Sequence, residues 1–226
     1  MSSARASDSR SGRAWSLVVP VKPAAVGKSR LEVPGVAREA LARAIALDTI
    51  AAAAGARLVA EVIVVTDDVG VRDELGRTRP STAHGTAPRV EVVADPAGGL
   101  NAAIATGLAT ASARYSAAML GDLPALRPAD LDEALERAGA PARSTEMNGR
   151  ALAVADADGT GTTLLAHAHP ELLRFGRDSY ARHLDAGAVP LDVPASSTLR
   201  QDVDTAAHLA AAHRLGLGPR TTALLA

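Results

Sequence analysis

Short apolar runs alternate with helix-favouring stretches along the first two thirds of the chain. Runs of β-branched and aliphatic residues, typical of buried strands, occupy residues 15–21, 61–66, 89–95 and 115–122. Stretches rich in Ala, Leu and charged residues predict helices at residues 36–55, 67–76, 99–114 and 128–139. Strands that alternate with helices in this way imply an α/β fold with a mostly parallel sheet and right-handed crossovers.

The pattern changes after residue 140, where the apolar segments become shorter and Gly-containing turns separate them. Short segments at residues 151–156, 161–167, 188–193 and 199–204 predict a β-rich half that is continuous with the first. An amphipathic helix, capped by Thr205, is expected to close the fold. Residues 1–13 are rich in Ser and Arg and predict a disordered tail. We therefore expect a single domain over residues 14–226, made of parts 14–140, 141–204 and 205–226.

Composition narrows the function classes. Hydrophobic residues make up 47% of the chain and charged residues 22%, as in ordinary globular proteins. A net charge of −1 and an aromatic content of 2% argue against a nucleic-acid partner, which needs a basic surface and stacking platforms. The absence of cysteine excludes disulfides and thiolate metal sites. No apolar stretch is long enough to span a membrane and no secretory signal is visible, so a cytoplasmic protein is expected.

Polar residues follow each of the four predicted parallel strands. They are Lys22, Thr66, Asp95 and Asp122. Because the carboxyl ends of parallel strands meet at one edge of a sheet, these side chains should gather there. Four such junctions in succession indicate a site of the size of a nucleotide.

The first of these loops carries Lys22, Lys28 and Arg30 within nine residues. Its Gly27-Lys28-Ser29 end fits a phosphate-binding P-loop, but Lys22 stands where the first glycine of that motif belongs, which argues against an ATPase. The three cations can instead neutralise a polyphosphate directly. A solvated basic loop is the alternative.

Two glycines, Gly98 and Gly99, directly precede the predicted helix that contains Asn101. Glycine allows a ligand to approach the backbone closely, and a helix N-terminus favours anionic groups. We expect Asn101 to contact the ribose or the base of a nucleotide. A plain strand-to-helix turn explains the same residues without a ligand.

Carboxylates from distant parts of the chain are candidates for a metal site. Asp122 ends an apolar strand, where an unpartnered charge is costly, and Mg²⁺ takes one or two carboxylates together with phosphate oxygens. Asp202 and Asp204 point the same way in an extended segment. We expect Asp202 to bind metal and Asp204 to cap the helix that follows.

Hydroxyls and glycines in residues 160–179 offer uncharged donors to a second anion. They are Thr160, Thr162, Gly176 and Ser179. The alternative is a set of ordinary turns. The histidines form no metal-binding motif, and His183, His208 and His213 are interpreted as helix-surface residues.

Six segments in this order resemble the guanylyltransferases of coenzyme F420 biosynthesis: "VPVK…GKSRL", "DPAGGLNAAI", "GDLPAL", "GTGTT", "FGRDS" and "RQDVDT". The resemblance runs from Trp15 to about Gly218. It implies a Rossmann-like GT-A type nucleotidyltransferase with a three-layer α/β/α sandwich. It also implies transfer of GMP from GTP to phosphoenolpyruvate with release of pyrophosphate. The segment from Arg77 to Arg89 and the N-terminal tail are additional to the family pattern.

Carried over residue by residue, the resemblance assigns the acceptor, phosphoenolpyruvate, to Thr162, Gly176 and Ser179. It assigns Mg²⁺ to Asp122 and Asp202, and catalytic roles to Lys22, Lys28 and Asp122. It assigns GTP contacts to the loop of Lys22, Lys28 and Arg30 and to the turn of Gly98, Gly99 and Asn101. The position at the ends of the strands adds Thr66 and Asp95 to the nucleotide-binding set. Residues 14–140 would then bind the nucleotide and residues 141–204 the acceptor.

Other readings stay open on the sequence. The acceptor could be 2-phospho-L-lactate or 3-phosphoglycerate, and a molybdopterin guanylyltransferase or a GT-A glycosyltransferase would share the sheet and Asp122. A non-catalytic nucleotide sensor would keep the cationic loop without needing two metal-binding aspartates. The sequence leaves the oligomeric state open, with a homodimer as one option.

Overall fold

A seven-stranded sheet forms the centre of the molecule. The computed structural model describes residues 13–23, 31–77, 88–139 and 150–226. The strands lie in the order β3-β2-β1-β4-β6-β5-β7. Their bounds are β1 Trp15–Pro20, β2 Val59–Val65, β3 Arg89–Val93, β4 Tyr115–Met119, β5 Leu152–Ala155, β6 Thr162–Ala166 and β7 Val189–Pro190. All neighbours pair in parallel except β6, which is antiparallel to both β4 and β5, so the predicted mostly parallel sheet is confirmed.

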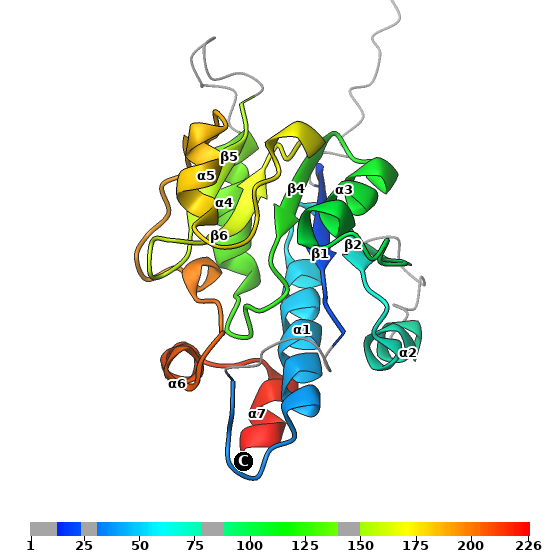
Figure 1. The fold of residues 1–226 in the computed structure, drawn as a ribbon, viewed down its shortest axis with the longest axis vertical. Coiled ribbons are helices and arrows are strands. Elements are labelled where there is room, and N and C mark those ends of the chain that lie inside the picture. Colours follow the sequence, from blue (N-terminus) through cyan, green and yellow to red (C-terminus); the bar gives the residue numbers. More distant parts are fainter. Residues whose placement is uncertain (1–12, 24–30, 78–87, 140–149) are drawn as a thin grey trace, which may run out of the picture.

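Helices cover both faces of this sheet (Figure 1). Buried residues of α1 and α4 pack on one face, while α3, α5 and a short 3-10 helix, η3, pack on the other, which gives the expected three layers. The bounds are α1 Arg38–Gly55, α2 Val69–Arg77, α3 Leu100–Thr110, α4 Pro128–Gly139, α5 Ser179–Asp185, α6 Ala206–Leu215, α7 Pro219–Leu225, η3 Pro170–Leu172 and η4 Thr198–Arg200. No helix in the described ranges is both long and apolar enough to cross a membrane.

Strands β1 and β2 are buried on both faces, as their largely apolar composition predicts. Every residue of β1 is buried, and in β2 only Ala60 is partly exposed. This burial explains why these strands lack the polar alternation of a one-sided sheet. The second half of the chain adds β5, β6 and β7 to the same sheet.

Several expectations about the second half need correction. The segment 199–204 forms no strand: it continues from the 3-10 turn η4 into irregular chain. Helices α5 and α7 were not expected from the sequence. The predicted tail 1–13 lies almost wholly outside the described residues, as does most of the segment between Arg77 and Arg89.

The C-terminal helix α7 is fixed by a carboxylate from the first helix. The two carboxylate oxygens of Asp48 accept hydrogen bonds from the backbone N–H groups of Arg220 (3.1 Å) and Thr221 (2.7 Å). The first N–H groups of a helix have no partner within it, so a buried carboxylate there stabilises the helix. Gly218 allows the close approach, because a Cβ on it would lie 2.4 Å from the carboxyl carbon of Asp48.

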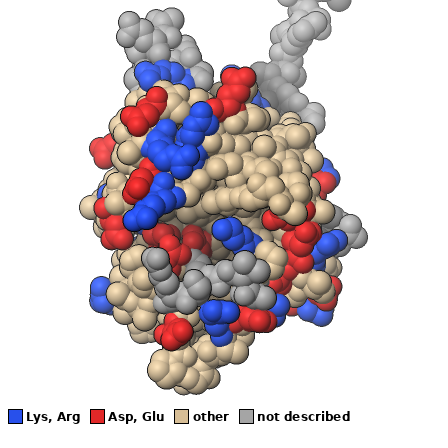
Figure 2. All heavy atoms as spheres, viewed as in Figure 1, with Lys and Arg blue, Asp and Glu red and all other residues tan. Residues whose placement is uncertain are grey.

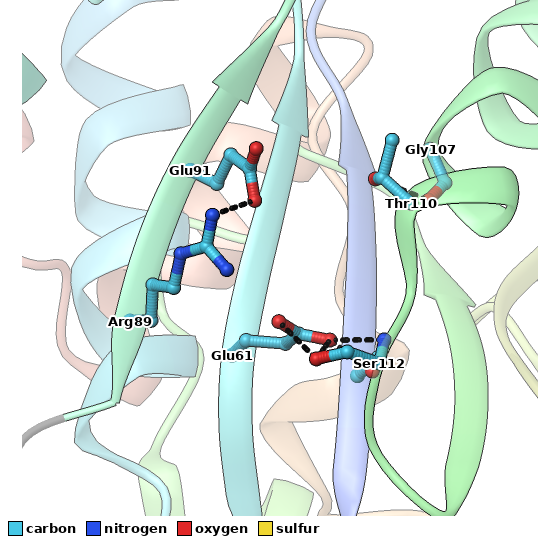
Figure 3. A network of polar contacts seen from close by, with 7 residues as sticks. Glu61, Arg89, Glu91, Gly107, Thr110 and Ser112 are labelled. Carbon is cyan, nitrogen blue, oxygen red and sulfur yellow. Dashed lines mark hydrogen bonds and ion pairs between the residues drawn. The ribbon is translucent and has the colours of Figure 1, made fainter.

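A second buried carboxylate, Glu61 of β2, joins three segments at the amino edge of the parallel strands (Figure 3). It accepts hydrogen bonds from the Ser16 hydroxyl in β1 and from the backbone N–H (2.6 Å) and hydroxyl (3.0 Å) of Ser112, after α3. Burial raises the pKa of Glu61, but these hydrogen bonds outweigh burial and hold the pKa below its ordinary value. The ionised carboxylate is therefore part of the folded structure.

We predict that Glu61→Gln lowers the free energy of unfolding by about 1–3 kcal/mol, because hydrogen bonds to a charged acceptor are stronger than those to a neutral amide and the NH₂ group cannot accept the bond that the Ser112 hydroxyl donates to Oε2. Urea denaturation at neutral pH measures the loss. Glu91→Gln is the matched control, since Glu91 is more exposed and forms an ion pair with the exposed side chain of Arg89 (Figure 3). The control should cost about 0.5 kcal/mol or less. Equal losses in the two variants would contradict the role given to Glu61.

Candidate functional site

The strand order reverses between β1 and β4, and the candidate site lies at the carboxyl ends of these two strands. From β1 the chain crosses to β2 on one side, while β4 pairs with β1 on the other. Ligands of open α/β sheets bind in the crevice that such a reversal creates. Lys22 follows β1 and Asp122 follows β4, so the reversal places a cation and a carboxylate at one crevice.

Gly121 permits β4 to end this close to β1. A Cβ on Gly121 would lie 3.0 Å from the carbonyl oxygen of Pro20 and 3.1 Å from the side chain of Val21. Real Cβ contacts are rarely so short, so a larger residue would force the two strand ends apart. Sterics therefore explain why a glycine precedes Asp122. Gly121 allows the ends of β4 and β1 to approach each other, and Asp122 then lies at the crevice.

A cleft with a volume of about 820 Å³ occupies this position. Figure 2 shows this face of the molecule hollowed near its middle, with acidic and basic side chains bordering the hollow. The cleft joins residues from both halves of the chain. Its polar lining includes Lys22, Asp122, Asp156, Gly176, Ser179 and Asp202.

One backbone hydrogen bond brings the two predicted metal-binding segments together. The N–H of Val203 donates to the carbonyl oxygen of Asp122, with N···O at 3.0 Å. Because Val203 directly follows Asp202, this bond fixes residues 80 positions apart at the same end of the cleft, and both carboxylates line it. Asp204 lines the cleft as well.

The carboxylates suit a hard divalent cation that also takes ligands from a substrate. Within the described ranges, no group of three or more His, Cys, Asp or Glu side chains is placed to hold a metal ion. Two carboxylates are nevertheless the usual protein share for Mg²⁺, which completes its shell with water and phosphate oxygens. Asp122 and Asp202 therefore fit a metal shared with a phosphorylated ligand.

Two residues were expected to cap α6, Thr205 and Asp204, and the structure supports only Thr205. Thr205 is the N-cap, as predicted, and its hydroxyl accepts a hydrogen bond from the N–H of His208 at 3.2 Å. Asp204 therefore does not cap this helix. Its backbone N–H faces the His208 ring instead.

The residues assigned to the acceptor lie on a loop and a hairpin that hydrogen-bond to each other. The backbone N–H of Thr162 donates to the Ser179 hydroxyl (2.8 Å). Gly176, with φ of 124°, requires glycine, and Asp178 adopts a left-handed φ of 52°. Gly176 and Ser179 line the cleft. The Thr162 side chain is buried and lies outside the cleft lining.

Asp156 is a cleft residue that the sequence analysis missed. Its carboxylate accepts hydrogen bonds from the backbone N–H groups of Thr160 (2.9 Å) and Gly161 (2.6 Å) in the turn between β5 and β6. A Cβ on Gly161 would collide with this carboxylate. The signal was present as an Asp four residues before Thr160 in a Gly-rich hairpin turn, a common site of side-chain-to-backbone hydrogen bonds.

His183 is buried in the structure, so its interpretation as a surface residue was wrong. The N–H of Arg174 donates to Nε2 at 3.0 Å, which leaves the proton of the neutral ring on Nδ1, 2.9 Å from the Thr162 hydroxyl. Burial lowers the pKa of His183 to about 4; the charges of Arg174 and Arg182 lower it further, and a hydrogen bond to the Ser179 backbone opposes them. The ring is therefore neutral at physiological pH.

The residues predicted to contact the nucleotide are only partly at the cleft. Lys28 and Arg30 lie outside the described residues. Among the described positions, the cleft lining includes Lys22 but none of Thr66, Asp95, Gly98, Gly99 and Asn101.

Three of these residues, Thr66, Asp95 and Gly99, have local structural roles. The buried Thr66 hydroxyl accepts a hydrogen bond from the N–H of Asp68, and the Asp95 carboxylate accepts one from the N–H of Ala97. Gly99 precedes α3 with φ of 84°, where glycine is favoured. The amide of Asn101 forms two hydrogen bonds with the backbone of Phe175, and the expected contact with ribose or base stays a prediction.

Comparisons with known proteins identify similar chains over nearly the whole length. A family model for the MobA-like NTP transferase domain matches residues 39–192. A phosphoenolpyruvate guanylyltransferase of Salinispora arenicola is 47% identical over 217 residues, covering 93% of this chain and 92% of that protein. The protein of the same name from Streptomyces coelicolor is 46% identical over 221 residues, covering 94% and 96%.

Solved structures support the fold. A structure from Desulfovibrio desulfuricans assigned as a nucleotide-diphospho-sugar transferase superposes with a TM-score of 0.64 at 17% identity and covers 93% of each chain. A nucleotidyl transferase from Methanothermobacter gives a TM-score of 0.55 at 21% identity, covering 90% of this chain and 98% of that one. The α/β GT-A-like nucleotidyltransferase fold is thereby confirmed.

We predict that acid destabilises the protein through His183. Below a pH of about 6.5 the imidazole of the unfolded chain takes up a proton, whereas the folded protein resists protonation down to about pH 4. The unfolded state therefore binds more protons in this window, and the free energy of unfolding should fall by about 2 kcal/mol from pH 7.5 to pH 5. Urea denaturation at the two pH values measures this change.

His183→Gln is the comparison, because glutamine does not titrate and can still accept a hydrogen bond near the Nε2 position. The variant shares every other histidine with the wild type, so the difference between their pH profiles isolates His183. Identical profiles would refute the assignment.

Proposed function

Because the chain belongs to the MobA-like NTP transferase family, we propose that it is a guanylyltransferase that transfers GMP from GTP to phosphoenolpyruvate and releases pyrophosphate. The names of its nearly full-length relatives support this activity. The observation that carries the proposal is the Val203–Asp122 hydrogen bond, which sets two carboxylates beside Lys22 and the loop of Gly176 and Ser179. The product would serve coenzyme F420 biosynthesis, as the family resemblance implies.

Asp122 and Asp202 would hold a divalent cation, which we propose to be Mg²⁺. Such an ion, when bound, neutralises phosphate charge and orients the reacting oxygens. Lys22 lines the same cleft and can stabilise the negative charge of the triphosphate. Lys28 and Arg30 follow Lys22 within eight residues of the chain. They would act on the leaving pyrophosphate.

The acceptor would bind on the other side of the cleft, against the loop of Gly176 and Ser179. Backbone N–H groups and hydroxyls hold a phosphate or carboxylate without adding a competing positive charge. The Thr162 side chain contacts the buried ring of His183. Thr162 would therefore contribute through its backbone N–H, which holds the Ser179 hydroxyl. The exposed Arg177 also lines this part of the cleft and can meet an anionic acceptor.

The proposed step needs no protein nucleophile. An oxygen of the acceptor phosphate attacks the α-phosphorus of GTP in line and forms the new P–O bond. The bond from the α-phosphorus to the bridging oxygen breaks, and pyrophosphate leaves with the electron pair. The acceptor phosphate is already ionised at neutral pH, so no proton has to be removed, and the residues of the cleft act by positioning and by charge stabilisation.

An acceptor panel tests the proposal. Purified protein is mixed with GTP and Mg²⁺ and with phosphoenolpyruvate, 2-phospho-L-lactate or 3-phosphoglycerate, and pyrophosphate release and product mass are measured. We expect the highest rate with phosphoenolpyruvate and no comparable rate with ATP. A higher rate with another acid would change the acceptor, and GTP binding without pyrophosphate release would indicate a nucleotide sensor.

We predict that Asp122→Asn and Asp202→Asn each reduce pyrophosphate release on the order of 10²-fold or more, because an amide is a much poorer ligand for Mg²⁺ than a carboxylate. Both variants should keep the wild-type far-UV spectrum and need more Mg²⁺ for half-maximal rate. Asp158→Asn is the control: this exposed carboxylate lies in the β5–β6 turn outside the cleft lining and should leave the rate unchanged. A wild-type rate in either metal-site variant would disprove the metal role.

A further inference from the structure

The loop from Arg174 to Ser179, called here the acceptor loop, begins at two consecutive residues that are held by side chains from other elements. We propose that Asn101 and His183 are positioning residues that fix this loop in its acceptor-binding conformation. The inference rests on the proposed function, because it assigns the loop to the acceptor. Neither side chain is part of the cleft lining. His183 is outside the residues that the family resemblance assigns to either substrate, and for Asn101 the proposal is an alternative to the GTP contact that the resemblance implies.

Asn101 holds the loop from the nucleotide side. Its side-chain oxygen accepts a hydrogen bond from the N–H of Phe175 (2.9 Å), and its NH₂ group donates to the carbonyl oxygen of Phe175 (3.1 Å). Both polar groups of the amide are thus used by a single residue 74 positions away. Asn101 stands in the first turn of α3, directly after Leu100, which lines the cleft.

His183 holds Arg174, the residue that precedes Phe175. Its Nε2 accepts the hydrogen bond of the Arg174 N–H (3.0 Å), and its ring packs edge-on against the Phe175 ring, with centroids 4.8 Å apart. Through Nδ1 it contacts the Thr162 hydroxyl, and the Thr162 N–H donates to the Ser179 hydroxyl. One imidazole therefore connects the first residue of the acceptor loop with its last.

The loop needs such anchors because its own backbone is strained. Gly176 has φ of 124° and Asp178 has φ of 52°, and a non-glycine residue in the left-handed region costs about 1 kcal/mol or more. Gly176, Arg177 and Asp178 are exposed, so packing contributes little to holding them. The conformation of this segment is therefore set by the hydrogen bonds at its two ends.

The proposal is tested with variants that remove one hydrogen bond each. His183→Asn keeps a donor near Nδ1 but loses the acceptor for Arg174, whereas His183→Gln keeps an acceptor near Nε2. Asn101→Asp keeps the acceptor for the Phe175 N–H but sets a second oxygen against the Phe175 carbonyl. His167→Asn is the matched control, because His167 packs on Trp15 and Tyr115 at the opposite edge of the sheet.

We expect His183→Asn and Asn101→Asp to raise the KM for phosphoenolpyruvate about tenfold while the KM for GTP stays within about twofold. His183→Gln should recover most of the loss. The control should lower thermal stability without changing either KM. Parallel increases in both KM values, or equal effects of His183→Gln and His183→Asn, would overturn the proposal; if the His183 variants do not fold, Asn101→Asp decides it alone.

Hydrogen–deuterium exchange separates this proposal from the proposed function. Peptides that contain Arg174 and Phe175 should exchange faster in His183→Asn and Asn101→Asp than in the wild type, while peptides of β1 and β2 should not change. This readout needs no substrate. If the wild type releases no pyrophosphate with any acceptor, the proposed function fails, and unchanged exchange in both variants shows separately that the two side chains do not fix the loop.

Discussion

The hydrogen bond from the Val203 N–H to the Asp122 carbonyl is the contact on which the arrangement of the cleft depends. It joins an irregular segment near the C-terminus to the end of a central strand. Neither segment would be confined by local structure alone, since residues 199–204 form no strand and β4 ends at Met119. Gly121 completes the constraint, because the absence of a side chain lets the end of β4 lie against β1. Two carboxylates and Lys22 consequently meet without being neighbours in the sequence.

The two edges of the sheet use polar groups for different purposes. At the amino edge, Glu61 and its serine partners form a network that connects adjacent segments and is not part of the lining of the candidate cleft. At the carboxyl edge, Asp122 and Asp202 line a cleft large enough for substrates. The carboxylate at the first edge is held by hydrogen bonds from the protein, whereas those at the second border a cleft that we propose to be the substrate site. Such a division allows stability to be retained while the functional edge remains polar.

The sequence predicted most of the fold because its signals are local. Largely apolar runs identify β1 and β2, and Thr205 marks the start of α6 through a cap that involves the next turn. Helix α7 could not be predicted in the same way, since its stability depends on Asp48, more than 170 positions earlier. The burial of His183 was missed for the same reason. Its neighbours in the chain, Arg182 and Leu184, carry no sign that Thr162 and Arg174 surround the ring.

Asn101 illustrates how a polar residue at a predicted ligand-binding edge can also hold another segment of the protein. Its position after two glycines and at the start of a helix is typical of a nucleotide contact, and the family resemblance gave it that role. In the structure, the NH₂ group and the carbonyl oxygen of the amide each form a hydrogen bond with the backbone of Phe175, so the orientation of the side chain is set by the protein. The turn that precedes α3 and the loop that precedes α5 are thereby connected through one side chain. On the proposal made above, a residue on the nucleotide side of the cleft thus helps to determine how the other side receives its acceptor.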